Sequence, residues 1–305
     1  MLRWFGYIIL TLVALGAAAY YWLIVDASGP WGGNAYAIDL AEVRSLANSI
    51  RNDKPTEIRL ERIAAFKMPF TAMVAGESWA EIDAPVYSYQ VVYPGAAAVV
   101  IDAAIDGVQA AKNKEPTFDA AAYARMQSAM TNASNIVITH EHLDHIGGIT
   151  AAPNLSAILA QVRLTKEQVD HPEKMGGLKF PDGALSGYTP LTYDKYHVLS
   201  PGVVLIKAPG HTPGSQLVFV QLADGREYLF LGDVAWRYES VERVRTRARF
   251  VSWWFLGEDR DAVLHELAEF KRLSDAEPKL IIVPGHDIKH MEALAAQQTF
   301  AGTFK

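Results

Sequence analysis

Residues 139–148 read THEHLDHIGG and place four candidate metal ligands within six positions. The four are His140, His142, Asp144 and His145. Imidazole and carboxylate groups are the ligands that borderline divalent cations such as zinc accept. The packing of a hydrophobic core gives no reason for four such side chains to follow one another so closely. We therefore predict that this segment binds metal.

The spacing inside this segment predicts two adjacent ions. His140 and His142 are two positions apart in an extended chain, so they point to the same side and can hold one ion. Asp144 and His145 lie where the chain turns into a helix and can hold a second ion. The glycine pair at 147–148 lets the backbone pass close to the site without a Cβ in the way.

Three later loops each supply one more candidate ligand. They are APGHTPGS with His211, FLGDV with Asp233 and VPGHD with His286. An isolated histidine is usually a structural or surface residue, but seven ligand-type residues in this arrangement form a joint pattern of low chance frequency. The other histidines of the chain lack such loops, and we predict structural or surface roles for them: His171, His197, His265 and His290.

Hydrophobic periodicity predicts alternating strands and helices, with each candidate ligand just past the end of a strand. Loops at strand ends, held by a rigid sheet, are where catalytic groups usually lie. The expected strands are 57–63, 86–92, 96–101, 135–139, 203–208, 216–221, 227–231 and 280–283, and the expected helices are 35–50, 118–130, 261–273 and one at the C-terminus.

Length and composition limit the classes of protein to consider. The chain has 305 residues, of which 50% are hydrophobic, so it can bury a sizeable core, and we favour one large domain over residues 28–305. The net charge of -6 gives no overall basic character of the kind that nucleic-acid binders show, so we do not expect nucleic acid as a partner. Because the chain has no cysteine, any metal must be held by histidine, aspartate or glutamate. Nothing in the sequence indicates an oligomeric state.

Residues 4–25 carry no charge and are long enough to cross a hydrocarbon core of about 30 Å. Aromatic residues stand near both ends, as expected at membrane interfaces: Trp4, Phe5, Tyr7, Tyr20, Tyr21 and Trp22. We therefore predict that residues 1–27 form a membrane anchor, with a signal peptide cleaved near the alanines at 17–19 as the alternative. Arg3 precedes the span and Asp26 follows it, so the rest of the protein is expected on the exterior or periplasmic side.

The four loops together resemble the metal-binding loops of the metallo-β-lactamase superfamily, over the chain from about residue 86 onward. The resemblance implies an αββα sandwich, in which two mixed β-sheets pack face to face between helices. It implies that His140, His142 and His211 bind one metal, that Asp144, His145 and His286 bind a second, and that Asp233 bridges them. It also implies that Asp102, at the end of an early strand, supports the site without binding metal.

The same resemblance narrows the subgroup. An aspartate at the position of Asp233 is typical of glyoxalase II, the acyl-homoserine lactonases and related esterases, whereas true metallo-β-lactamases usually lack it or have cysteine. His142 differs from the glutamate of the flavodiiron branch. Lactonases often carry a tyrosine three residues after the bridging aspartate. Here that position is Trp236, with Tyr238 two further on, and we regard both as candidate substrate-binding residues.

The chemistry implied is hydrolysis with two divalent ions, zinc first and manganese or iron as alternatives. A water shared between the ions attacks the carbonyl of a small ester, lactone or thioester, and Asp144 orients it and moves its proton. The alternatives are a β-lactamase-type amide hydrolase, a phosphodiesterase or nuclease of the same superfamily, and a catalytically silent binding protein. The sequence has no G-x-S-x-G elbow and no phosphate-binding glycine loop.

Two segments are candidates for the substrate pocket. Residues 236–260 mix arginines with aromatic residues, which is either a pocket wall or, as we favour, a solvated basic helix face followed by core aromatics. The arginines in question are Arg237, Arg243, Arg245, Arg247 and Arg249. Residues 171–193 are long and irregular, which fits equally a lid over the site or a surface insertion.

Overall fold

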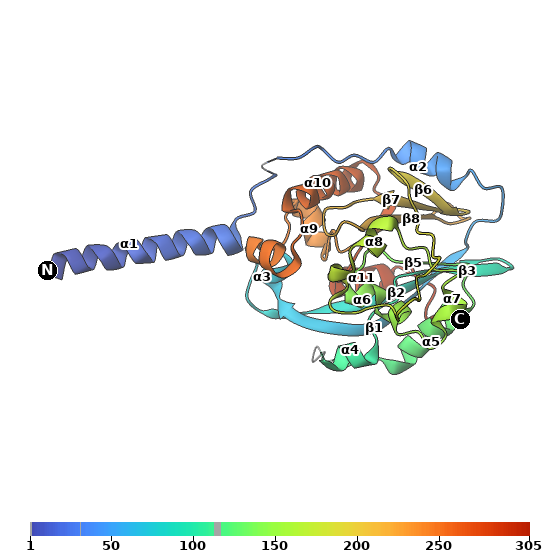
Figure 1. Cartoon of the computed structure of the whole chain (residues 1–305). Helices are drawn as coiled ribbons and strands as arrows, with labels where there is room; N and C mark the ends of the chain where they lie inside the picture. The colour runs from blue at the N-terminus through green and yellow to red at the C-terminus, as the bar shows by residue number, and fades with distance from the viewer. Residues whose placement is uncertain (1, 31, 113–116) are drawn as a thin grey trace.

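The computed structural model describes residues 2–30, 32–112 and 117–305, so Met1, Trp31 and residues 113–116 lie outside it. Helix α1 (Leu2–Tyr20) continues into the short helix η1 (Tyr21–Val25). Figure 1 shows α1 projecting away from the rest of the molecule. By length and composition, Arg3–Val25 is one apolar helix able to cross a membrane, and none of it is buried inside the protein.

The first sheet is mixed and has the strand order β4-β1-β2-β3-β5. Strand β3 pairs in parallel with β5, and the other neighbours are antiparallel. The parallel register sets Ile101 beside Val137, so the residues that follow both strands reach the same edge. The strands are β1 (Glu57–Pro69), β2 (Glu81–Tyr93), β3 (Ala96–Ile101), β4 (Thr117–Phe118) and β5 (Asn135–Val137).

The second sheet is also mixed, with the order β10-β9-β8-β7-β6. Its parallel pair is β9 and β10, in which Phe230 lies beside Val283. The end of β9 and the end of β10 therefore meet at one edge, next to the loop that joins β7 to β8. The strands are β6 (Tyr196–Ser200), β7 (Val203–Lys207), β8 (Gln216–Gln221), β9 (Glu227–Gly232) and β10 (Leu280–Pro284).

Helices flank the two sheets, as predicted. Several begin at an aspartate N-cap whose carboxylate accepts a backbone N–H, for example Asp119 before α5 and Asp259 before α10. The helices are α2 (Leu40–Ala47), α3 (Phe70–Met73), α4 (Gly107–Lys112), α5 (Ala120–Thr131), α6 (Leu143–Thr150), α7 (Leu155–Ile158), α8 (Lys166–Asp170), η2 (Pro172–Met175), α9 (Tyr238–Arg243), η3 (Val251–Leu256), α10 (Arg260–Ala276) and α11 (Ile288–Ala296).

The buried apolar residues form three main layers. Side chains of both sheets fill the middle layer, where the ring of Tyr89 lies 4.7 Å from that of Phe230. Met126 and Ile146 belong to the layer between the first sheet and its helices. Phe219 and Phe270 belong to the layer between the second sheet and helices α2 and α10. Two sheets packed between helices hold the site loops at one edge.

Three predicted elements differ from the structure by five residues or more at one end, among them the expected strand 86–92, which begins at Glu81. The expected helix 35–50 is only Leu40–Ala47, because the N-cap Asp39 fixes its start. The expected strand 57–63 continues to Pro69, through a bulge between Arg62 and Ala64, and pairs with the early part of β2 from Glu81. Three consecutive buried residues, Ile63, Ala64 and Ala65, interrupt any alternation at the bulge, which is why periodicity alone ends the strand too early.

Replacing Phe230 by alanine tests the middle layer. Phe230 is 2% exposed, so Phe230→Ala leaves a cavity between the sheets and lowers the free energy of unfolding by about 3–5 kcal/mol. Urea unfolding followed by circular dichroism measures this. The control is Val108→Ala, on an exposed position of α4, which changes stability by less than about 0.5 kcal/mol. Equal effects of the two substitutions would contradict the layer assignment.

Candidate metal centre

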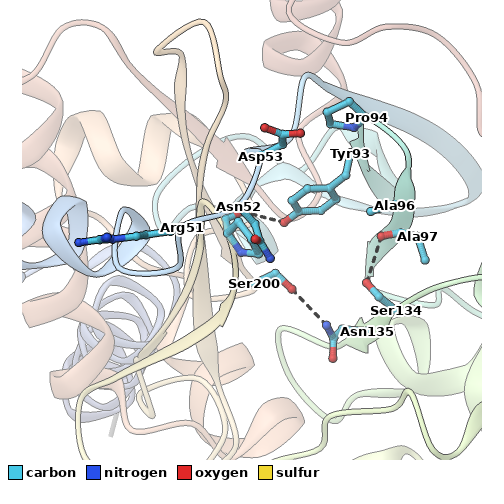
Figure 2. Close-up of a pocket in the computed structure, with 11 residues that line it drawn as sticks. Arg51, Asn52, Asp53, Tyr93, Pro94, Ala96, Ala97, Ser134, Asn135 and Ser200 are labelled. Atoms are coloured by element: carbon cyan, nitrogen blue, oxygen red, sulfur yellow. Dashed lines mark hydrogen bonds between the residues drawn. The ribbon is translucent and has the colours of Figure 1, made fainter.

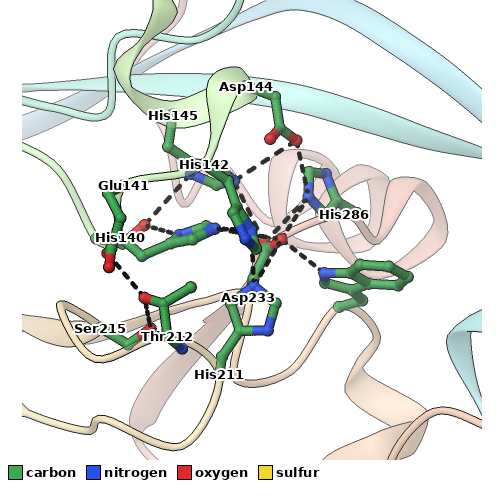
Figure 3. A network of polar contacts seen from close by, with 12 residues as sticks. His140, Glu141, His142, Asp144, His145, His211, Thr212, Ser215, Asp233 and His286 are labelled. Atoms are coloured by element: carbon green, nitrogen blue, oxygen red, sulfur yellow. Dashed lines mark hydrogen bonds and ion pairs between the residues drawn. The ribbon is translucent and has the colours of Figure 1, made fainter. Parts of the chain in front are cut away.

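All seven predicted ligands converge at the shared edge of the two sheets (Figure 3). The loop after β5 carries His140 and His142, and the first turn of α6 carries Asp144 and His145. The β7–β8 loop, the end of β9 and the end of β10 supply one residue each: His211, Asp233 and His286. The prediction that each ligand follows a strand is confirmed, and four separate stretches of the chain build one cluster.

The first group consists of three imidazoles and one carboxylate oxygen. His142 Nδ1 lies 3.0 Å from His140 Nε2 and 3.1 Å from His211 Nε2. Asp233 Oδ2 lies 3.6 Å from His140 Nε2 and 3.7 Å from His211 Nε2. Four ligand atoms of the right kind therefore face a common point.

The second group uses the other oxygen of the same aspartate. Asp233 Oδ1 lies 3.0 Å from His286 Nε2 and 3.3 Å from His145 Nε2. Asp144 Oδ2 lies 3.4 Å from His286 Nε2 and 3.7 Å from His145 Nε2. Asp233 thus stands between the two groups with one oxygen toward each.

These separations fit metal coordination. Ligand atoms about 2.0–2.1 Å from one tetrahedral zinc ion lie about 3.3–3.4 Å from each other. Within each group the ligand atoms all lie within 4.8 Å of one another. Among the residues that the structure describes, His145 Nε2 and Asp233 Oδ1 are buried and have no hydrogen-bond partner. Buried polar atoms without a partner are costly, and a cation would satisfy both.

Asp102 supports the cluster, as expected, through contacts with its first loop. Its carboxylate accepts the backbone N–H of Thr139 at 2.6 Å and lies 2.9 Å from His145 Nδ1. The contact with Nδ1 leaves Nε2 of the same ring free to face the cluster. Asp102 has a φ of 60°, an uncommon left-handed conformation for this residue type. Such strain persists where the surrounding structure fixes it, here through Thr139 and His145.

Two buried glutamates that the sequence analysis missed hold the His211 loop. Glu258 Oε2 lies 3.0 Å from His211 Nδ1 and accepts a bond from Arg247 at 2.8 Å. Glu141 accepts bonds from the Thr212 hydroxyl at 2.8 Å and the Gly214 N–H at 3.2 Å. Glu141 stands between two ligand histidines, which was a usable signal. No local pattern marks Glu258, because only the fold brings it to His211.

The electrostatics of the cluster favour cation binding. Burial, reinforced by neighbouring imidazoles, holds the pKa of His140 and that of His142 well below the ordinary value, so both stay neutral. Burial alone would raise the pKa of Asp233, but His286 and the other histidines around it lower that pKa well below its usual range. In the second group burial alone would lower the pKa of His145 and that of His286. Nearby carboxylates, Asp102 and Asp233 for His145 and Asp233 for His286, raise both pKa values above the ordinary value. Neutral imidazoles around an ionised carboxylate are the states that a divalent metal requires, so a cation in the second group displaces protons from these two rings.

A cavity of about 630 Å³ opens over the cluster. Its floor includes His142, Asp144, Asp233 and His286, and its walls are largely apolar. Trp236 lines this cavity, as predicted, and its indole N–H donates to Asp233 Oδ2 at 2.6 Å.

Tyr238, the other candidate for substrate binding, points elsewhere. Its hydroxyl lies 2.8 Å from that of Ser274, and its ring stacks on His290 with centroids 4.2 Å apart. The tyrosine belongs to the layer under α10, so the position two residues after Trp236 faces away from the cavity. His290 contacts the carbonyl of Ile282, which agrees with the structural role predicted for it.

Residues 236–260 do not match either of the two predicted roles as a whole. Part of the segment lines the cavity, and two of its arginines are buried. Its aromatics Phe250 and Phe255 line the cavity. Arg247 and Arg249 are not solvated and do not line the cavity. Both side chains are buried and donate hydrogen bonds within the protein. The favoured interpretation of a solvated basic face is therefore wrong for these two residues. Arginine burial depends on partners far along the chain, which composition does not reveal.

Only a small part of the predicted lid reaches the cavity. Glu173, Lys174 and Gly176, in and just after η2, form part of the rim. Beyond them the segment packs on the first helical layer through residues such as Leu178 and Tyr188. Residues 171–193 therefore belong mostly to the folded body, with one turn at the cavity mouth.

A second hollow, of about 510 Å³, lies near the β2–β3 turn (Figure 2). Its hydroxyl and amide groups bond mainly to the protein itself: Tyr93 donates to the Pro201 carbonyl at 2.9 Å, and Asn135 donates to Ser200 at 3.1 Å. It contains none of the clustered histidines. The chemistry of the molecule is therefore concentrated at the His/Asp cluster.

Two glycines, one in α6 and one in the loop after β10, leave no room for a side chain. A Cβ at position 148 would lie 2.2 Å from the carbonyl oxygen of Ala103, and a Cβ at position 285 would lie 2.5 Å from Asp233 Oδ1. At 147–148 the close approach is to the backbone of residues 103–106 and not to a clustered ligand, so these glycines let α6 pack on the loop after β3.

The sequence profile of the metallo-beta-lactamase superfamily matches residues 83–286, which include every one of the clustered ligands. The chain belongs to this superfamily. The match extends from β2 to the loop after β10, so it covers all four site loops, the whole second sheet and the first sheet without β1. The fold and the family predicted from the loops are confirmed.

Among known members of the superfamily, an N-acyl homoserine lactonase of Bacillus thuringiensis is 30% identical over 154 residues, which are 50% of this chain and 56% of that protein. This chain therefore spans about half the length of the curated relatives it matches. The structure of an N-acyl homoserine lactone hydrolase with the product N-hexanoyl-L-homoserine at its catalytic metal centre has a TM-score of 0.62 at 18% identity, over 79% of this chain and 96% of that one. The dizinc quorum-quenching lactonase AidC has a TM-score of 0.52 at 15% identity, over 77% of this chain and 90% of that one. At these identities the structural likeness concerns the fold.

Metal content tests the shared carboxylate. We expect two divalent ions per chain after supplementation with zinc or manganese, measured by inductively coupled plasma mass spectrometry. Asp233→Ala removes a ligand from both groups and should lower the content of both ions. The control is Asp224→Ala, on the exposed hairpin between β8 and β9. Retention of both ions in Asp233→Ala would overturn the bridging assignment.

Glu258 provides a test of the supporting contacts. Burial alone would raise its pKa, but Arg247 and His211 lower that pKa to about 2, so the carboxylate stays ionised. Glu258→Gln removes this charge from His211, and we expect metal affinity to fall about 10–100-fold. Competition with a fluorescent chelator measures the affinity. The control is Glu167→Gln on α8, which removes the ion-pair partner of Lys207 and should leave the metal affinity unchanged.

Proposed function

We propose that this protein is a dinuclear metal-dependent hydrolase that cleaves a lactone or small ester carrying an apolar acyl group. The observation that carries the proposal is the pair of ligand groups sharing Asp233 at the floor of an apolar cavity. The N-acyl homoserine lactonases among its relatives support a lactone as the first substrate to try. Zinc is the metal we expect, since the ligands are imidazole and carboxylate.

In this proposal His140, His142 and His211 hold one ion, and Asp144, His145 and His286 hold the other. Bound divalent cations lower the pKa of water toward neutrality and polarise a carbonyl oxygen. Asp233 fixes the spacing of the two groups, and the Trp236 N–H fixes the orientation of that carboxylate. Trp236 stands where related lactonases carry tyrosine, so an indole N–H takes the place of a phenol beside the cluster.

Asp144 is the residue we propose to move protons. Its carboxylate lies at the cavity floor, where one of its oxygens is close to the imidazoles of His145 and His286. It accepts the proton that the attacking water loses and passes it to the alkoxide that leaves. Water adds to the carbonyl carbon, the acyl C–O bond breaks, and the products are an alcohol and a carboxylic acid, joined as one hydroxy acid when the substrate is a lactone.

The apolar helix at the N-terminus supports a membrane location. We propose that residues 1–27 remain attached as an anchor and that the catalytic domain, residues 28–305, faces the exterior or periplasm. Only Arg3 precedes the span, and Asp26 is the first charge after it, which agrees with a cytoplasmic N-terminus. Cleavage near residues 17–19 would instead release the domain into the periplasm. The mass of the chain extracted from membranes distinguishes the two.

Hydrolysis of a small panel tests the function. The full chain in mild detergent should open an N-acyl homoserine lactone, lose turnover on chelation and recover it with zinc or manganese. Asp144→Asn should lower kcat about 10²–10⁴-fold with a smaller change in KM, because a proton carrier acts mainly in the transition state. Nitrocefin and bis(p-nitrophenyl) phosphate report the amide and phosphodiester alternatives. Turnover that persists after complete metal removal would reject the proposal.

A further inference from the structure

Five large aromatic side chains form an exposed patch, which we call the aromatic rim. Its members are Trp79, Phe250, Trp253, Trp254 and Phe255, with exposed fractions from 37% to 74%. Four of the five lie on or directly before the single turn η3. Exposed apolar patches of this kind mark surfaces that contact protein or membrane. Tryptophan in particular gathers at the level of lipid headgroups.

The aromatic rim is continuous with the end of the apolar helix. Trp22, near the end of the span, packs edge-on against Trp253 with ring centroids 5.2 Å apart. Trp253 contacts Trp254 at 6.2 Å, and Trp254 contacts Phe250 at 5.6 Å. On another element, the Trp79 indole N–H donates to the Tyr20 hydroxyl at 2.9 Å. The rim therefore lies at the level where the helix would leave a bilayer.

The junction between helix and domain is fastened by hydrogen bonds. Arg249 is fully buried there and donates to the Trp22 carbonyl at 3.1 Å, to the Ser28 hydroxyl at 2.8 Å and to the Asp26 carboxylate. The Gly76 N–H donates to the Ile24 carbonyl at 3.0 Å. These contacts hold η1 against the domain, so the position of the rim relative to the span is fixed.

Two members of the aromatic rim also line the cavity above the cluster. Phe250 and Phe255 line that cavity, together with Val251 and Leu256 of the same turn. Lys174, at the opposite side of the mouth, donates to the carbonyls of Leu256 and Gly257 at 3.1 and 3.0 Å. An apolar path therefore leads from the end of the membrane helix along η3 to the metal ligands.

We propose that the bilayer covers the aromatic rim and that the cavity takes its substrate from the membrane. The substrate would be a lactone or ester whose long acyl chain is dissolved in lipid, with the carbonyl reaching the cluster along η3. This inference rests on the proposed hydrolase function and on the anchor. The bilayer is the occupant we favour, because two of the rings, Trp253 and Trp79, contact the helix that we propose lies in lipid.

The absence of cysteine allows a direct test of rim depth. Trp254→Cys, labelled with an environment-sensitive NBD fluorophore, is reconstituted as the full chain in phosphatidylcholine/phosphatidylglycerol vesicles. We expect blue-shifted emission that brominated phospholipid quenches. Ile50→Cys, which lies just beyond α2, is the matched control and should report water. In Figure 1, α2 lies at the far side of the domain from the free end of α1.

Two results would overturn the membrane assignment. Water-like emission from the labelled Trp254→Cys protein in vesicles would show that the rim stays in solvent. Shielding that grows with the protein-to-lipid ratio, with energy transfer between labelled chains, would instead assign the rim to a second copy of this protein. Neither result depends on catalysis, so each can be obtained whether or not the protein is a hydrolase.

A kinetic comparison tests substrate delivery. Trp79 and Trp254 do not line the cavity, so the double variant Trp79→Ser/Trp254→Ser should leave kcat/KM for a water-soluble short-chain lactone unchanged. For a long-chain lactone carried in vesicles we expect kcat/KM to fall about tenfold, since interfacial rings are lost from the cavity mouth. Equal kcat/KM of variant and parent protein on the vesicle substrate would overturn delivery from lipid. Failure of the parent protein to hydrolyse the short-chain lactone would instead reject the hydrolase proposal.

Discussion

The carboxylate of Asp233 is the constraint on which the rest of the site depends. One oxygen faces His140 and His211, and the other faces His145 and His286. This arrangement requires the ends of both sheets to meet within a few ångströms. The two parallel pairs, β3 with β5 and β9 with β10, achieve this because parallel strands deliver their following loops to one edge. The antiparallel remainder of each sheet supplies the apolar layer that holds the edge in place.

A carboxylate buried among histidines is stable only when the charged and polar groups around it have hydrogen-bond or ion-pair partners. Arg247 supplies such contacts. It donates hydrogen bonds to the Asp233 backbone carbonyl and to Glu258, and its guanidinium lies 4.2 Å from the Trp236 ring centroid. Glu258 in turn fixes His211. Removing one member of such a network leaves another charge buried without its partner, which is far more costly than losing a surface ion pair. The network therefore keeps the ligand atoms in position.

The stretch after Asp233 connects the site to the N-terminal helix. Trp236 touches the bridging carboxylate, Arg249 fastens the end of the apolar helix, and η3 forms both the cavity wall and an exposed surface. One continuous segment thus relates the position of the cluster to the position of the span. A substrate that partitions into lipid would meet the apolar wall before it meets a metal ligand. In our proposal, the same contacts therefore set both the position of the anchor and the choice of substrate.

The sequence by itself determined the set of candidate ligands, the order of the strands that carry them and the family. These features are local: ligand spacing in THEHLDHIGG depends on strand and helix geometry, and each later ligand has its own glycine-containing loop. Only the tertiary structure decided that Glu258 holds His211, that Arg249 is buried against Trp22, that β1 extends to Pro69, and that Tyr238 faces away from the cavity. Burial and pairing depend on residues distant along the chain, so composition and periodicity carry no record of them. Figure 3 brings together side chains from loops separated by almost half of the sequence, and that proximity exists only in the fold.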